Sequence, residues 1–102
     1  MRRRIAFSPE AETQLLDIFQ YIAEAASPET AERFTASVVD FCEALQLFPE
    51  RGTRRDDLRP GMRTVGFKRS VTIAFLIGQQ TVTIIGVFYG GQDVEAVLSR
   101  ED

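Results

Sequence analysis

The stretch VTIAFLIGQQTVTIIGVFY, residues 71–89, decides the fold of this sequence. Two sets of side chains alternate over residues 71–77, with the period of two that is typical of a strand. Gly78-Gln79-Gln80 then turns the chain, and the same period returns over residues 82–89. Residues 71–89 are therefore predicted to form a β-hairpin.

The last strand of this hairpin is apolar on both sides. Strict alternation puts one apolar set (Val82, Ile84, Phe88) on one face and another (Ile85, Val87, Tyr89) on the opposite face. A layer of helices covers only one face of a small sheet, so the other face is expected to expose an apolar patch that a partner covers. The alternative is that residues 93–102 fold back over this face with Val94, Val97 and Leu98.

Two helices are predicted upstream of the hairpin. The tripeptide Ser-Pro-Glu at residues 8–10 recurs at 27–29, and each copy is a helix start with serine as N-cap and proline at the first helical position. Apolar residues follow both starts at spacings of three and four, ending at Phe48, and Pro49 and Gly52 end the second helix. A short strand at Ile5–Phe7 precedes them, and residues 63–67 form a further strand in which Gly66 marks a bulge or a close backbone approach.

These elements predict a single domain over residues 1–102. Its fold class is α+β in the order β-α-α-β-β-β, with an N-terminal helical hairpin packed on one face of a small, mainly antiparallel sheet. A short helix or tail from Asp93 to Leu98 closes the chain.

Composition excludes several classes of chemistry. The 102 residues contain no histidine and one cysteine, so histidine catalysis, histidine-bound metals and internal disulfides are all excluded. The chain has no cofactor motif, and Gly90-Gly91 lacks the context of a phosphate loop. The N-terminus has no apolar region long enough for a signal peptide, which indicates a cytoplasmic protein without a membrane span.

Charge is concentrated in one segment. Residues 51–69 carry seven basic and two acidic side chains in a chain whose net charge is −3. One interpretation is a solvated loop that balances acidic helices, and the other is a contact surface for a partner.

The order of these motifs resembles the ParE branch of the RelE/ParE toxins over residues 3–95. The resemblance rests on the Ser-Pro start and Leu-x-x-Ile-x-x-Tyr-Ile-Ala pattern within residues 8–23, the helix end at 45–52, Arg63 before the strands, and VFYGGQD at 87–93. It implies the toxin of a type II toxin–antitoxin pair, neutralised by an antitoxin resembling ParD. ParE-like toxins act on DNA gyrase, whereas RelE-like relatives cut messenger RNA on the ribosome.

The residues favour the first activity. Cleavage of RNA needs basic and acid/base side chains, yet residues 70–90 contain neither lysine nor arginine. Gly86 stands where many relatives have arginine, and Tyr89 stands where histidine is often found. We therefore expect a toxin that binds gyrase without catalytic residues. The alternatives are a ribosome-dependent endoribonuclease using Arg63, Lys68 and Tyr89, or a non-toxic scaffold that acts only in repression by the antitoxin.

Two sets of contact residues are predicted on this basis. A partly unstructured antitoxin segment is expected to fold against apolar anchors or the sheet edge: Leu15, Phe19, Ile22, Phe34, Val38, Phe75, Ile85 and Val87. Glu10, Asp17 and Glu24, at intervals of seven, form either a solvated face or a contact for antitoxin lysines and arginines. Operator DNA is contacted only through the antitoxin, and no metal is expected. The basic segment and the chain end are expected to face gyrase: Arg59, Arg63, Lys68, Arg69, Tyr89 and Asp93.

Overall fold

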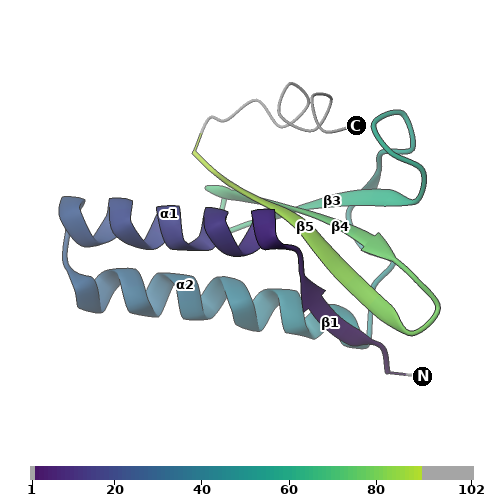
Figure 1. Cartoon of the computed structure of the whole chain (residues 1–102), viewed down its shortest axis with the longest axis horizontal. Helices are drawn as coiled ribbons and strands as arrows, with labels where there is room; N and C mark the ends of the chain where they lie inside the picture. Colours follow the sequence, from purple (N-terminus) through teal and green to yellow (C-terminus); the bar gives the residue numbers. More distant parts are fainter. Residues whose placement is uncertain (1, 91–102) are drawn as a thin grey trace.

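A computed structural model of the chain describes residues 2–90 and shows a helical hairpin packed on a five-stranded sheet (Figure 1). The sheet order is β1-β5-β4-β3-β2, with β1 parallel to β5 and all other pairs antiparallel. This arrangement confirms the predicted α+β fold, while the predicted helix or tail over residues 93–98 lies outside the described residues. The elements in chain order are β1 (Arg4–Phe7), α1 (Pro9–Ala25), α2 (Pro28–Glu43), the 3-10 turn η1 (Ala44–Gln46), β2 (Thr53–Arg54), β3 (Met62–Phe67), β4 (Val71–Ile77) and β5 (Thr81–Tyr89).

Both helices begin as the repeated tripeptide predicts. The Ser8 hydroxyl accepts a hydrogen bond from the backbone N–H of Ala11 at 3.1 Å, and Ser27 accepts one from Thr30 at 3.1 Å. Each contact satisfies one of the backbone N–H groups that a helix start leaves without a partner. Two residues separate the helices, so α1 and α2 run back along each other as the hairpin drawn in Figure 1.

The main core lies between this hairpin and one face of the sheet. Ala11 on α1 and Ala31 on α2 are completely buried. Larger side chains of the helices and the sheet fill the space beside them. The buried members of this core are Ala11, Ile18, Ile22, Ala31, Val38, Cys42, Leu45, Val71, Ile73, Phe75, Val82, Ile84 and Val87.

A β-bulge in β5 changes which side chains face the helices. Ala74 pairs with Gly86 and Phe75 pairs with Ile84, so Ile85 is an extra residue in the ladder. Val82 and Ile84 face the helices before the bulge, and Val87 and Tyr89 face them after it, while Ile85 and Phe88 face the other way. The strict alternation expected for the last strand was therefore wrong, because one inserted residue reverses the pattern.

Close approaches to a glycine are found at Gly86 and at Gly52 but not at Gly66. A Cβ atom at Gly86 would lie 2.4 Å from the Cε2 atom of Phe88, so the aromatic ring covers the glycine backbone. Gly66 has open space around its Cβ position and pairs regularly with Thr72, which contradicts the bulge predicted there.

The second face of the sheet is a small core of its own. Met62, Ala74, Ile85 and Phe88 are buried there, and Leu58 from the loop between β2 and β3 packs against them. The expected exposed patch on this face is therefore wrong. The alternative that residues 93–102 cover it lies outside the described part of the chain.

The end of the second helix also differs from the prediction. Helix α2 ends at Glu43, and the tighter 3-10 turn that follows advances each residue by a larger angle than an α-helix does. Phe48 therefore leaves the apolar stripe, and 68% of its surface is exposed. Strand β2 was not predicted, because its two residues are exposed and only their pairing with Arg63 and Thr64 defines it.

Candidate functional site

A row of aromatic rings joins α1, α2, β3 and β5 at one end of the sheet. The Tyr89 ring lies 5.8 Å from Tyr21 and 5.7 Å from Phe34, measured between ring centroids. Phe41 stacks on Phe67 with centroids 4.6 Å apart. We call these five residues the aromatic row, and it brings together positions from four elements.

Cations lie over this row. The Lys68 ammonium group is 5.5 Å from the centroid of the Phe67 ring and 5.9 Å from that of Phe34, and the Arg51 guanidinium group is 5.2 Å from that of Phe41. Such distances are typical of cation–π contacts. The structure thus brings three of the predicted residues, Phe34, Lys68 and Tyr89, to one place.

The turn between β3 and β4 holds its two basic residues in an unusual backbone conformation. Lys68 has φ of 52° and Arg69 has φ of 63°, which is the left-handed region that glycine and asparagine adopt more readily. Both side chains are exposed. Two adjacent cations are therefore presented at the cost of backbone strain, and such strain is concentrated at functional positions.

The remaining basic residues of the segment form a different region. Arg54 pairs with Asp56 at 3.2 Å and Arg55 pairs with Asp57 at 2.9 Å. The backbone N–H of Gly61 donates to Asp56 and, together with Arg54, holds the pKa of that carboxyl group below its ordinary value. The side-chain hydrogen bond from Arg55 likewise lowers the pKa of Asp57. Asp56 and Asp57 therefore neutralise the charge of Arg54 and Arg55 within their own loop, so the acidic helices are not needed to balance these two arginines.

Arg63 and Arg59 both contact backbone carbonyl groups. The Arg63 guanidinium group donates to the backbone carbonyl of Arg51 at 3.3 Å. Arg59 is partly buried in the loop, where its backbone N–H donates to the carbonyl of Arg55 at 3.2 Å. Asp93 lies outside the described residues.

Seven of the eight predicted antitoxin contacts fall into two groups, and the eighth, Phe34, belongs to the aromatic row. Ile22, Val38, Phe75 and Val87 are buried in the main core, and Ile85 is buried on the opposite face of the sheet. These five hold the domain together, so none of them presents a surface unless the core opens.

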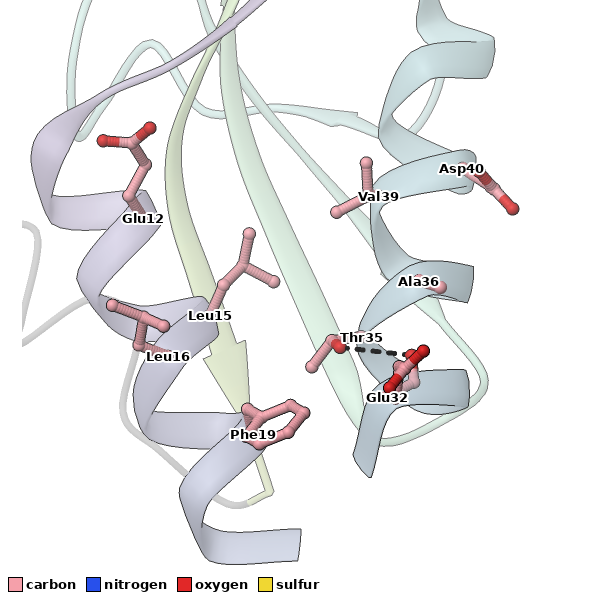
Figure 2. A pocket seen from close by; sticks show the side chains of 9 residues that line it. All are labelled: Glu12, Leu15, Leu16, Phe19, Glu32, Thr35, Ala36, Val39 and Asp40. Carbon is pink, nitrogen blue, oxygen red and sulfur yellow. Dashed lines mark hydrogen bonds between the residues drawn. The ribbon is translucent and has the colours of Figure 1, made fainter. Parts of the chain in front are cut away.

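Leu15 and Phe19 instead line an open groove between α1 and α2. Figure 2 looks into this groove, with strands of the sheet behind the two helices. Its volume is about 680 Å³. Sequence reasoning missed most of its lining, since Leu16 lies off the apolar stripe of α1 and the α2 members are small or polar. The lining residues are Glu12, Leu15, Leu16, Phe19, Glu32, Thr35, Ala36, Val39 and Asp40.

Helix α1 covers part of the edge of β5. β1 pairs with β5 only as far as Ile84, and beyond it the side-chain oxygen of Gln14 accepts a hydrogen bond from the backbone N–H of Val87 at 2.7 Å. The Gln14 side chain thus accepts the hydrogen bond that a carbonyl group of a neighbouring strand would accept from Val87. A partner strand would have to displace it to extend the sheet there.

The single cysteine has no nucleophilic character. Burial, assisted by the charge of Glu43, raises the pKa of the Cys42 thiol to about 12. The thiol therefore stays protonated at neutral pH and behaves as a small apolar core residue. Within residues 2–90, no group of three acidic, cysteine or histidine side chains is placed to hold a metal ion. None of the helices in this range is long and apolar enough to cross a bilayer.

The fold and these surfaces define a small α+β domain that presents a cationic aromatic end and a separate helical groove. A family model described as "ParE toxin of type II toxin-antitoxin system, parDE" matches residues 5–94. The chain therefore belongs to the ParE family of type II toxins.

Solved structures show the same fold. A chain of the chromosomal ParDE toxin–antitoxin system from P. aeruginosa is 20% identical with a TM-score of 0.75, and the match covers 87% of this chain and 97% of that one. A chain of the RelBE2 toxin–antitoxin complex from Mycobacterium tuberculosis is 19% identical with a TM-score of 0.64, covering 87% of this chain and 99% of that one. No curated protein matches the sequence.

Proposed function

We propose that this toxin inhibits DNA gyrase by binding, without a catalytic residue of its own, and that an antitoxin resembling ParD neutralises it. Family membership supports the general activity. The observation that carries the proposal is the strained Lys68–Arg69 turn beside the aromatic row, because two exposed cations next to planar rings suit an anionic, partly apolar protein surface or DNA held by the enzyme.

Lys68, Arg69 and Tyr89 are the proposed centre of the target contact. Lys68 and Tyr89 both lie against the Phe34 ring, so one face presents both side chains. Arg59 and Arg63 are proposed to lie at the margin of the contact, and Asp93 stays a prediction. Gyrase and the antitoxin would both meet the toxin in the cytoplasm.

The direct test adds the purified chain to gyrase, relaxed plasmid and ATP and measures supercoiling. We expect inhibition by the wild type and at least about tenfold weaker inhibition by the double variant Lys68→Glu with Arg69→Glu. A matched control, Arg2→Glu with Arg4→Glu, makes the same change in net charge at two exposed positions near the N-terminus. If the turn variant inhibits as strongly as the control, the proposed contact is wrong.

The endoribonuclease alternative has one supporting observation. Lys68 and Tyr89 both contact the Phe34 ring, so a cation and a phenol lie in the same region, as a phosphate-cleaving site requires. Translating ribosomes with messenger RNA form the parallel assay. Cleavage there with no effect on gyrase would favour the RelE-like activity, and no effect in either assay would favour the non-toxic scaffold.

The proposed antitoxin is the product of a small ribbon-helix-helix reading frame directly upstream. Co-expression of that product should restore growth and yield a complex that survives gel filtration. If no complex forms, the pairing proposed here is wrong. Operator DNA is then proposed to bind the complex through the antitoxin, with no direct contact to this chain.

A further inference from the structure

A second, smaller pocket lies between α1 and β5, on a different face of α1 from the groove. Ile18 and Val87 are almost fully buried, so they form its bottom. Its volume of about 200 Å³ is below the about 300–1,000 Å³ that is typical of sites for drug-sized ligands, so it has room for a single side chain. We call it the tyrosine pocket, and its other lining residues are Gln14, Asp17, Tyr21 and Tyr89.

Two aromatic rings line the tyrosine pocket. The centroids of Tyr21 and Tyr89 lie 5.8 Å apart, and their ring planes are inclined at 58°. Tyr21 exposes 61% of its surface, so much of its ring is open to a ligand. The face of an aromatic ring is partly negative and attracts a cation, and two or more such rings are a common way of binding one. The pair therefore favours a positively charged ligand.

Asp17 adds a full negative charge to the same pocket. It lies one turn before Tyr21, so both side chains are on one face of α1. The side chain is exposed and has no ion-pair partner among residues 2–90. Helix α1 carries four acidic residues and no basic one, and Glu10 and Glu24 flank Asp17 at intervals of seven. No cation of the same helix therefore offsets the charge of Asp17.

The tyrosine pocket does not suit an anion. The backbone N–H of Val87 already donates to the side-chain oxygen of Gln14 at 2.7 Å. A phosphate or carboxylate group would have to break this hydrogen bond to use that donor, and Asp17 would repel the anion. Residues 91–102 of the chain carry four acidic residues and one arginine, so their net charge has the same sign as Asp17.

The combination of ring and carboxylate fits arginine better than lysine. A guanidinium group is planar, so it stacks on an aromatic ring while its N–H groups donate in a fork to a carboxylate. Tyr21 and Asp17, one helical turn apart, supply both partners to one side chain. A lysine ammonium group is compact and strongly hydrated, and it cannot stack.

The tyrosine pocket borders the proposed centre of the target contact. The Tyr89 ring also contacts Phe34, and the Lys68 ammonium group lies over that same Phe34 ring. A DNA surface is anionic throughout and would be repelled at Asp17. A protein surface presents charges of both signs, so it can be complementary to Lys68 and to Asp17 together.

We propose that the tyrosine pocket receives an arginine side chain from the protein surface of the toxin's target, stacked on Tyr21 and paired with Asp17. That this target is gyrase rests on the proposed function. The contact then joins the toxin to the protein part of its target and not to DNA. Lys68 and Arg69 meet anionic groups of the same protein surface.

The first test titrates the isotope-labelled chain with N-acetyl-arginine N-methylamide and follows the backbone amide signals by NMR. We expect saturable shifts at Asp17, Tyr21 and Val87, with a dissociation constant in the millimolar range because one side chain buries little surface. The citrulline analogue has the same length without the charge, and the lysine analogue keeps the charge without the planar group. Both should bind about fivefold more weakly or less. Equal binding of the citrulline analogue would overturn the inference.

Variants of the two partner residues locate the binding. Asp17→Asn should weaken binding of the arginine compound about tenfold. The matched control, Glu24→Gln, removes the same charge from the same helix outside the pocket and should change binding less than about twofold. Tyr21→Leu should weaken binding about fivefold, whereas Tyr21→Phe keeps the ring and should restore it. The NMR spectra also establish that each variant folds.

The second test repeats the supercoiling assay with the same variants. We expect Asp17→Asn and Tyr21→Leu to inhibit gyrase about fivefold more weakly than the wild type, and Glu24→Gln to inhibit equally well. If Asp17→Asn inhibits as strongly as the wild type, the pocket is not part of the target contact and the inference is wrong. Stronger inhibition by Asp17→Asn would indicate that this face meets DNA, which also overturns the inference.

The outcomes separate this inference from the proposed function. If the arginine compound binds through Asp17 but the wild type does not inhibit gyrase, the pocket is supported and the proposed target is wrong. If the wild type inhibits gyrase but does not bind the compound, the inference is wrong and the proposed function is unaffected. If Asp17→Asn weakens only the binding of the antitoxin, the pocket belongs to that partner and the inference is wrong.

Discussion

Two faces of α2 contribute to surfaces of opposite chemistry. The outer groove with α1 joins an apolar floor to three carboxylates, whereas the end of the sheet joins aromatic rings to Lys68 and Arg51. Both surfaces rest on one core, yet the residues that line the groove are not those of the aromatic row. The difference teaches that a domain of this size can carry two separate surfaces of unlike charge.

The comparison also shows two ways of treating surface charge. Around the groove, the exposed carboxylates have no ion-pair partner among the described residues, while in the loop at 54–57 each acid is paired with an arginine two positions earlier. Exposed pairs contribute little to stability, but they cancel the local field. The two aspartates thus neutralise Arg54 and Arg55. Lys68 and Arg69, in the strained turn, are exposed cations that these aspartates do not neutralise.

The largest effect is expected from a change in the core beneath both surfaces. Phe75 is completely buried, and Phe75→Ala should lower the free energy of unfolding by about 3–5 kcal/mol through lost burial and a cavity. Urea unfolding followed by circular dichroism measures this. Gyrase inhibition and antitoxin binding should decline together at temperatures where the variant unfolds. A loss below about 1 kcal/mol would show that the two surfaces do not depend on this core.

An intermediate effect of opposite sign is expected at the strained turn. Lys68→Asn with Arg69→Gly supplies residues that accept a positive φ and should stabilise the fold by about 1 kcal/mol, while inhibition of gyrase falls. The control Lys68→Ala with Arg69→Ala removes the same charges but keeps the strain, so its melting temperature should not rise. Equal melting temperatures for the two variants would contradict the assignment of strain.

The smallest effect concerns acid pH. The folded-state pKa values of Asp56 and Asp57 lie below their ordinary values, so the stability from their ionised forms is complete above about pH 4 and is lost as pH falls through the lowered values. Asp56→Asn should therefore show a shallower loss of thermal stability between about pH 4 and pH 2 than the wild type. Both groups are exposed, so the difference is small. A steeper loss in the variant would contradict the pairing within the loop.

Local patterns predicted much of the fold because they depend on neighbours in the sequence. The serine caps and the helical spacing of α1 require only contacts within a few residues, and the alternation over β4 has the same origin. The bulge at Ile85 did not follow from such patterns, since it depends on how two strands align and on the ring of Phe88 covering Gly86.

The candidate surfaces were predictable only in part. The excess of positive charge in residues 51–69 identified Lys68 and Arg69, but the pairing of Arg54 and Arg55 with their own aspartates needed the loop conformation. Apolar residues on helices were expected to be contacts, and most of them are core. Apolar spacing alone does not distinguish a side chain that faces the sheet from one that faces solvent, which is why Leu16 was missed.

The sequence by itself determined the order of the helices and of every strand except β2, the family, and the exclusion of histidine chemistry, because each depends on residue types and their spacing. The tertiary structure alone decided that Ile22, Val38 and Phe75 are buried, that Phe34, Lys68 and Tyr89 meet, and that an acidic groove opens on the outer side of the hairpin. The physical reason is that burial and contact between distant residues depend on how elements pack, and packing is a property of the whole chain.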